Sequence, residues 1–354
     1  MVYLKGMGGV MGCSYIVKSA TYLPKKYDAG ELTGKLYKDS ASSKLARRFS
    51  ASTGVENRFI SIELGGEKRV LPGESPVEWL SLLYNELLEN RRANFISLSY
   101  NVSSHENFVP TISSQLCSEL GLTQLTTPPE EHLFMGCASA IFSINSAIKY
   151  CKKHKEGIAF VASYEQSSWL FNPENNRNSP DFIPSLRGHS LFGDGAAGLL
   201  IVGEQMAGEF ENRALIIDVQ LSFSPGSCIG MKGGNFLVGD GVGAIMPGMV
   251  AKEVILPLLN RNNLKIFDVD EWSIHQGSHL ILDEFKKDKV LGLTDMQLKK
   301  SHYMLSKVGN ISSPSCIFVF NEWLKEKNNT TDRYGLIVGF GAGYYMGAVL
   351  YKRV

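Results

Sequence analysis

No stretch of this 354-residue sequence is long and apolar enough to cross a membrane. The first residues, MVYLKGMGGVMGCSYIVKSATYLP, lack the charged and then apolar pattern of a secretory signal. Charge of one sign is also lacking, because 36 Lys and Arg are balanced by 35 Asp and Glu, which leaves no overall field to attract nucleic acid or a membrane surface. These absences predict a globular cytoplasmic protein.

The six cysteines lack the paired CxxC spacing of zinc sites and do not suggest a disulfide framework. We therefore expect no metal, and we expect most of them to be small buried hydrophobic residues. Cys137 differs, because GCASA places it among small residues just ahead of a long apolar run without proline. At a helix N-terminus, unpaired N–H groups and the helix dipole lower a thiol pKa, so Cys137 is a candidate nucleophile.

Strand-like and helix-like segments alternate along the chain and predict an α/β fold. The segments EEHLFMG and GIAFVASY are typical of parallel strands on either side of the helix that follows Cys137. A stretch rich in asparagine, proline and serine at 171–190 is expected to be a loop between two halves. The predicted organisation is an extension at 1–14, a first half at 15–180 that carries Cys137, and a second half at 181–354.

Two polar residues of the second half lie where a strand ends and a helix begins. His275, in SIHQGSHLILDEF, can point into the same crevice as Cys137, although a lone histidine is more often a surface or hydrogen-bonded residue. Asn310, in GNISSPS, is either a helix cap or an amide donor aimed with His275 at a developing oxyanion. Spacing alone does not choose between these interpretations.

The glycine-rich stretches FGDGAAGLLI and GFGAG match neither a P-loop nor a dinucleotide-binding pattern. We expect them to let the backbone approach the crevice, with the amide of Gly341 or of Cys137 forming an oxyanion hole. Several apolar side chains are candidates for the wall of a substrate pocket, although any core would contain them too. These are Met135, Phe142, Trp169, Phe236 and Met246.

The chain resembles the ketoacyl-acyl-carrier-protein synthase III family of condensing enzymes in five motifs that occur in the same order: GCASA, FGDGAAGLLI, HQGSHLILDEF, GNISSPS and GFGAGYYMGAVL. The resemblance extends from SATYLP near residue 19 to the C-terminus and includes STGVENRFI at 52–60. It implies the thiolase fold, with two similar halves stacked as five αβαβα layers, and a homodimer. It also implies a Cys-His-Asn triad, which falls on Cys137, His275 and Asn310.

What the resemblance implies chemically is a ketosynthase of fatty-acid, polyketide or related biosynthesis. Cys137 would take an acyl group from a coenzyme A or acyl-carrier-protein thioester, and a carbanion made from a malonyl or β-ketoacyl thioester would attack it. His275 and Asn310 would donate hydrogen bonds to the carbonyl of the second substrate as the enolate forms. No bound cofactor is expected, because the thioester itself supplies the activation.

Departures from the family pattern favour a specialised relative over housekeeping fatty-acid initiation. In RRFSASTG, Arg48 and Ser52 lie near the positions where better-known members clamp adenine with an aromatic and a basic residue. The family's HQAN is HQGS here, and Leu280 stands near the place of a basic residue that helps to dock carrier protein. Products such as β-ketoacyl compounds, pyrones, resorcinols or quinolones suit these departures.

Other charged residues admit two interpretations each. Glu106, in SSHENFVP, lies where some relatives hold a base for non-decarboxylative chemistry, but it is also typical of a solvated loop charge. Basic residues that could meet an acidic carrier protein, or simply form solvated faces, are Lys44, Arg47, Arg48 and Lys232.

Two alternatives to condensation stay open. One is an acyltransferase that moves the chain from Cys137 to an oxygen or nitrogen nucleophile. The other is a non-catalytic partner subunit of a heterodimeric ketosynthase, which the presence of all three triad residues argues against.

Overall fold

The computed structural model describes residues 12–354 apart from 38, 65–68, 105–108, 124, 172–177, 227–228, 233–234, 240 and 327–330. The strands are β1 (Ser14–Tyr22), β2 (Lys25–Asp28), β3 (Asn57–Ile60), β4 (Phe95–Tyr100), β5 (Glu130–Leu133), β6 (Ile158–Gln166), β7 (Asp194–Gly203), β8 (Ala214–Phe223), β9 (Ile229–Lys232), β10 (Asn235–Val238), β11 (Val269–Ile274), β12 (Tyr334–Phe340) and β13 (Tyr345–Arg353). The helices are α1 (Ala29–Leu36), α2 (Ser40–Thr53), α3 (Pro76–Leu88), α4 (Ile112–Glu119), α5 (Ser139–Lys153), α6 (Phe182–Leu191), α7 (Val242–Val250), α8 (Leu256–Arg261), α9 (His279–Glu284), α10 (Asp295–Val308) and α11 (Ser315–Leu324). Within this described part of the chain, no helix is both long and apolar enough to span a bilayer.

Nine strands form one sheet in the order β11-β12-β13-β8-β1-β7-β6-β4-β5. The sheet consists of two groups that meet at β1 and β8, which are joined through the pairs Tyr15 with Leu215 and Ile16 with Ala214. β7 follows the boundary predicted at residue 180, yet it pairs with β1 and β6 and so lies with the earlier strands. The division of the chain into halves at that residue stays a prediction.

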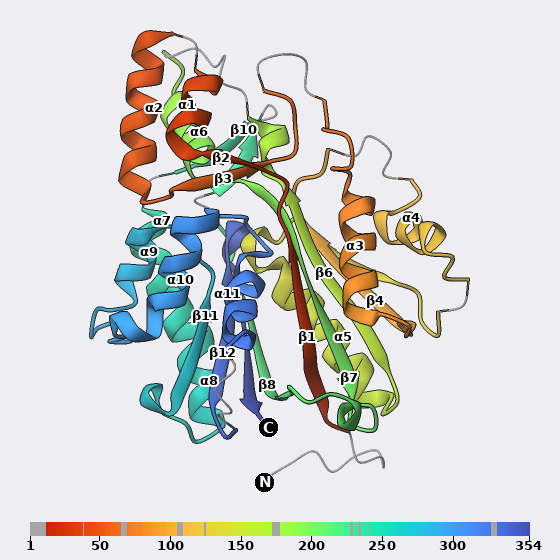
Figure 1. Ribbon diagram of the computed structural model, residues 1–354. Helices are drawn as coiled ribbons and strands as arrows, with labels where there is room; N and C mark the ends of the chain where they lie inside the picture. The colour runs from red at the N-terminus through yellow and green to blue at the C-terminus, as the bar shows by residue number, and fades with distance from the viewer. Residues whose placement is uncertain are drawn as a thin grey trace.

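Helices α5 and α11 lie in the middle of the molecule, between the two groups of strands (Figure 1). Helix α5 contacts β4, β6 and β7 on one side and β12 and β13 on the other. Helices α3 and α4 cover the outer face of the first group, and α8 and α10 cover the second. The five alternating layers implied by the family resemblance are therefore present.

The sequence of α5 explains its central position. Ile141, Ile144 and Ile148 recur at helical spacing and are buried, while Lys152 and Lys153 lie in the last turn, where cations favour the helix dipole. Its neighbour β6, with the sequence IAFVASYEQ, is buried along its whole length, as expected for a strand covered on both faces. Cys137, at the start of α5, therefore lies between the two groups of strands.

One predicted loop is wrong in part. Residues 182–191 form helix α6, which packs against α2 and β10 above the central sheet (Figure 1). Phe182 and Leu186 are four residues apart and are both buried on one face of this helix. Pro184 is tolerated because the first turn of a helix leaves its N–H groups without intrahelical partners. The earlier part of this stretch, 172–177, lies outside the described residues.

Candidate active site

Cys137 lies in a short 3₁₀ turn, Gly136–Ala138, which follows β5 and leads directly into α5. The position at a helix N-terminus is as predicted, but the side chain is buried, and this burial raises the pKa of the thiol to about 12. The prediction of a lowered pKa is therefore wrong, because loss of solvent around the sulfur outweighs the hydrogen bond from Ser312 that acts in the opposite direction. The sulfur lies 3.4 Å from the hydroxyl oxygen of Ser312.

The turn Gly136–Ala138, here called the cysteine turn, is in direct backbone contact with the GFGAG segment. Two glycines allow this close approach. A Cβ added to Gly341 would lie 2.3 Å from the nitrogen of Cys137, and one added to Gly136 would lie 2.3 Å from the nitrogen of Ala342. Close backbone approach, as predicted, is therefore the role of Gly341. Its N–H donates to the carbonyl of Tyr345 over 3.0 Å, which contradicts the prediction that this amide forms the oxyanion hole. The amide of Cys137 stays a prediction for that role.

His275 follows the end of β11, where its backbone N–H donates to the carbonyl of Val338 over 2.9 Å. The ring packs edge-on against Phe340, with 5.3 Å between ring centroids. Burial lowers the pKa of His275 to about 3, so the imidazole is neutral near pH 7. A neutral imidazole offers one N–H donor and one nitrogen acceptor to a ligand.

Both the nitrogen and the oxygen of the Asn310 side-chain amide form hydrogen bonds. Its Nδ2 donates to the carbonyl of Gly277 over 3.1 Å, and its Oδ1 accepts from the N–H of Ser312 over 2.8 Å. Helix α11 begins only at Ser315, so Asn310 does not cap it. Because the Nδ2 group carries two hydrogens, one N–H remains for a ligand, which favours the interpretation as an amide donor.

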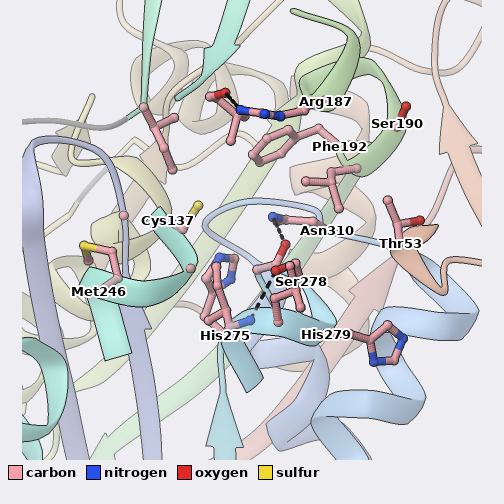
Figure 2. Close-up of a pocket in the computed structure, with 18 of the residues that line it drawn as sticks. Thr53, Cys137, Arg187, Ser190, Phe192, Met246, His275, Ser278, His279 and Asn310 are labelled. Atoms are coloured by element: carbon pink, nitrogen blue, oxygen red, sulfur yellow. Dashed lines mark hydrogen bonds between the residues drawn. The ribbon is translucent and has the colours of Figure 1, made fainter. Parts of the chain in front are cut away.

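These three side chains line one cavity of about 450 Å³ (Figure 2). They come from three segments that are far apart in the sequence, and Met246 and Gly341 line the same cavity. The other walls are largely apolar. They include Phe49, Phe192, Ile229, Val238, Ile281 and Phe340.

Three other predicted pocket residues, Met135, Phe142 and Trp169, do not line this cavity. Phe142 packs edge-on against Tyr345, with 5.7 Å between centroids. Trp169 is partly buried against an apolar cluster that includes Phe171 and Phe192. The side chain of Phe236 and the whole of Glu106 lie outside the described residues, so both stay predictions.

The mouth of the cavity lies between the end of α2 and the start of α9. Ser52 and Thr53 line one side, and Leu280 lines the other with 75% of its surface exposed. Arg187 also lines the cavity and donates to the carbonyl of Val238 over 3.4 Å.

The basic residues considered for a carrier protein differ in their surroundings. Lys44, Arg47 and Arg48 are exposed on α2, whereas Lys232 forms an ion pair with Asp181 at 3.0 Å.

Sequence reasoning missed two serines that follow Asn310. Besides the contact of Ser312 with Cys137, the hydroxyl oxygen of Ser313 accepts from the N–H of Ala140 over 2.8 Å and from the hydroxyl of Ser163 over 2.9 Å. The N-terminal turn of α5 is thus capped by a residue from the other half of the chain. The only signal in the sequence was the run of small hydroxyl residues in GNISSPS.

Glu165, also missed, is a buried carboxyl group near the end of the apolar strand β6. It accepts hydrogen bonds from the Nδ2 of Asn101 and from the N–H of Val102, the latter over 3.0 Å. Burial raises the pKa of Glu165 to about 7, although these hydrogen bonds act in the opposite direction. A glutamate ending a strand of apolar residues was the available signal.

Comparison with known proteins agrees with this architecture. Residues 259–353 match the family model described as 3-oxoacyl-[acyl-carrier-protein (ACP)] synthase III C terminal. The structure superposes on PKS-I from the brown alga Ectocarpus siliculosus with a TM-score of 0.79 and 18% identity, over 97% of this chain and 99% of that one. This likeness establishes the thiolase fold.

Curated relatives extend the match beyond the C-terminal half. The chain is 28% identical over 264 residues to a Bacillus subtilis protein assigned as a chalcone synthase, covering 71% of this chain and 69% of that protein. It is 28% identical over 271 residues to an alpha-pyrone synthesis polyketide synthase-like protein of Mycobacterium tuberculosis, covering 73% of this chain and 66% of that protein. Together with the fold and the C-terminal family match, these relatives show that the chain is similar to synthase III and to proteins named as chalcone and polyketide synthases.

Proposed function

We propose that this protein is a ketosynthase that joins two acyl units through a carbon–carbon bond in polyketide biosynthesis. The observation that carries the proposal is the meeting of Cys137, His275 and Asn310 around one cavity (Figure 2). The names of the curated relatives, a chalcone synthase and an alpha-pyrone synthesis protein, support a polyketide product over a housekeeping fatty acid.

In the proposed reaction, the sulfur of Cys137 attacks a thioester carbonyl, the donor thiol leaves, and the acyl group stays on the enzyme. A malonyl thioester then enters and loses carbon dioxide, and its α-carbon attacks the acyl-enzyme carbonyl. His275 and the free N–H of Asn310 are the proposed donors to the thioester oxygen of this second substrate, where negative charge develops. The thiolate of Cys137 departs when the new carbon–carbon bond has formed.

The walls of the cavity support an acyl chain as the bound group. Phe49, Phe192, Met246 and Phe340 present apolar surface next to the polar trio, which is the usual composition of a small-molecule site. The exposed basic residues of α2 lie on the helix that ends at the mouth and suit an anionic donor, either coenzyme A or the acidic surface of a carrier protein. We propose a thioester of one of these carriers as the donor and no bound cofactor.

The test is intact-protein mass spectrometry after incubation with a panel of acyl-coenzyme A and acyl-carrier-protein thioesters. We expect a mass gain equal to one acyl group, which is absent in Cys137→Ala. Addition of malonyl thioester should then release a product one ketide unit longer, with loss of carbon dioxide.

Other outcomes separate the alternatives. An acyl adduct that moves to an added amine or alcohol without a new carbon–carbon bond would indicate an acyltransferase. A folded protein that takes no acyl group from any donor would overturn the proposal in favour of a partner subunit. Cys316→Ala serves as a matched control, since Cys316 is a buried cysteine outside the cavity and its loss should leave acylation intact.

A further inference from the structure

Two imidazoles meet where the start of α9 packs against α10. The Nδ1 atoms of His279 and His302 are 2.9 Å apart, and the two rings stack with 5.0 Å between their centroids. His279 lines the mouth of the cavity, and its ring points away from Cys137 (Figure 2). A hydrogen bond between two Nδ1 atoms needs one nitrogen that carries a proton and one that does not.

The ring of His279 is also packed against the end of α2. A Cβ added to Gly54, the C-cap of that helix, would lie 2.1 Å from the Nε2 of His279. Gly54 has a φ of 70°, in the left-handed region that favours glycine. His279 is therefore held between the end of α2 and the side of α10.

Helix α10 is bonded to both ends of the segment 275–278. Before this segment, the Oγ of Ser301 donates to the carbonyl of Ile274 over 3.0 Å. After it, the neighbouring residue on α10, His302, contacts His279. The conformation of the four-residue segment is therefore fixed from α10.

The carbonyl of Gly277, inside this segment, orients the amide of Asn310. It accepts from the Nδ2 of Asn310 over 3.1 Å, which leaves the second hydrogen of that nitrogen for a ligand. Because Gly277 is two residues from His279, a displacement of His279 would move this carbonyl and turn the amide with it. Small misplacements of a reacting group cost large factors in rate.

The number of protons on the two rings decides whether their contact persists. With no added proton, the Nδ1–H of one ring donates to the Nδ1 of the other. One added proton binds at the Nε2 of the donor ring and leaves the hydrogen bond intact. A second added proton occupies the accepting Nδ1, and two N–H donors cannot remain 2.9 Å apart.

The surroundings of His302 oppose this second proton. Burial lowers the pKa of His302, and the charge of His279 acts in the same direction. The other charged groups that act on His302 are Asp283 and Lys286 of α9 and Asp295 of α10. Lys286 lowers this pKa and the two carboxylates raise it, with the Oδ1 of Asp283 lying 3.7 Å from the Nε2 of His302. The hydrogen bond is therefore lost only below the ordinary histidine pKa of 6.5.

We propose that His279 and His302 are positioning residues of the condensation step. Their shared hydrogen bond fixes the carbonyl of Gly277 and, through it, the amide of Asn310, so loss of this bond in acid slows condensation. Acylation of Cys137 does not use this amide and is spared. The proposal rests on the role of Asn310 in the proposed function.

The experiment measures acylation by intact mass and condensation by product mass, from about pH 5 to about pH 8. For the unaltered protein we expect the ratio of condensation rate to acylation rate to fall by about ten-fold between about pH 6.5 and about pH 5. In His302→Asn, an amide replaces Nδ1 without titrating, so the ratio should keep its neutral-pH value throughout. In His302→Leu the hydrogen bond is absent, and the ratio should be low at every pH.

The variants also define the results that would overturn the proposal. A fall in acid in His302→Asn that matches the unaltered protein would mean that another group titrates. An unchanged ratio in His302→Leu at about pH 7.5 would mean that the contact does not position Asn310. His154→Asn is the matched control and should keep the fall in acid, since His154 stacks on Tyr150 at the C-terminal end of α5, with 4.4 Å between centroids.

Urea unfolding gives a readout that needs no substrate. Because the folded-state pKa of His302 is lowered, its contribution to stability is complete above about pH 6.5 and is lost as the pH falls. Relative to the unaltered protein, His302→Asn should therefore gain stability below about pH 6.5, whereas His154→Asn should not. Parallel curves for His302→Asn and the unaltered protein would overturn the imidazole pair. A divergence in a protein that forms no product would support the pair and count against the proposed function alone.

Discussion

The two helices of the central layer, α5 and α11, begin in different ways. Each follows a turn that carries a proposed reacting group, Cys137 before α5 and Asn310 before α11. The turn before α11 is closed locally, because the Oγ of Ser315 accepts from the N–H of Ile311 over 3.0 Å. The turn before α5 instead depends on Ser313, which comes from the α11 side of the molecule.

This difference shows that the proposed nucleophile is positioned by contact between the two groups of strands and their helices. Three of the contacts that fasten the cysteine turn and the start of α5 come from the C-terminal part of the chain: the backbone of Gly341, the hydroxyl of Ser313 and the hydroxyl of Ser312. The turn that carries Asn310 is hydrogen-bonded to residues 191–193. The N–H of Gly193 donates to the carbonyl of Asn310 over 3.0 Å. Changes to the cysteine turn should therefore lower both the rate of acyl-enzyme formation and the free energy of unfolding.

The largest effect is expected from Gly341→Ala, which pushes the cysteine turn away from the C-terminal segment. The new Cβ would lie 2.3 Å from the nitrogen of Cys137, so one of the two backbones must move. We expect at least a hundred-fold loss of acyl-enzyme formation, with a destabilisation of about 1–3 kcal/mol. Intact mass and urea unfolding would measure these effects.

The control for this change is Gly248→Ala in α7. No heavy atom lies within 4 Å of a Cβ at that position, and alanine is favoured over glycine inside a helix by roughly 0.5–1 kcal/mol. Equal acylation rates in Gly341→Ala and Gly248→Ala would contradict the inferred backbone contact.

His275→Ala tests whether acylation and condensation depend on different residues. We expect acylation of Cys137 to be spared, while product formation falls by about 10²–10³-fold, the usual effect of removing one oxyanion donor. Acylation is followed by intact mass, and condensation by the mass of the released product. Asn310→Ala should behave similarly. Simultaneous loss of both steps in His275→Ala would contradict the role given to this histidine.

The sequence located the three residues that meet at the cavity better than it predicted their environment. Cys137, His275 and Asn310 could be found because each belongs to a short motif, and the strand and helix around each follow local rules of periodicity. Gly341 was located for the same reason, although its amide is bonded to Tyr345 rather than free. Local patterns place such residues at strand ends, and strand ends meet in this class of fold.

What escaped prediction depends on contacts between distant segments. The direction of the Cys137 pKa shift is set by burial, which the helix end alone does not reveal. The grouping of Glu165 with Asn101 joins two strands whose register is unknown from sequence. Phe142 was a pocket candidate for its apolar character, which any core residue shares, and it packs against Tyr345.

Ser313→Ala tests the cap that α11 supplies to α5. Removal of the hydroxyl leaves the buried N–H of Ala140 and the hydroxyl of Ser163 without this acceptor, which should cost about 1–3 kcal/mol. The shift of the urea midpoint at constant slope would measure this loss. Ser114→Ala, at an exposed position in α4, should change stability by less than about 0.5 kcal/mol. A Ser313 variant as stable as the Ser114 variant would show that the cap is dispensable.

The smallest effect is expected in the pH dependence of stability, where Glu165 and His275 act in opposite directions. The folded-state pKa of Glu165 is raised from its ordinary value near 4.5 to about 7, so its stabilising contribution is complete below about pH 4.5 and is lost as the pH rises towards 7. The folded-state pKa of His275 is lowered from 6.5 to about 3, so its contribution is complete above about pH 6.5 and is lost as the pH falls towards 3.

Glu165→Gln removes only the first of these contributions. Relative to the unaltered protein, the variant should therefore gain stability as the pH rises from about 4.5 to 7, by on the order of 1–3 kcal/mol. Urea unfolding at several pH values, with Glu131→Gln as the control, would measure the difference. Parallel curves for Glu165→Gln and the unaltered protein would mean that Glu165 is already ionised near pH 5. A divergence of the two curves between pH 4.5 and 7 would instead show that burial, which outweighs the hydrogen bonds from Asn101 and Val102, holds this carboxyl group protonated in the folded protein.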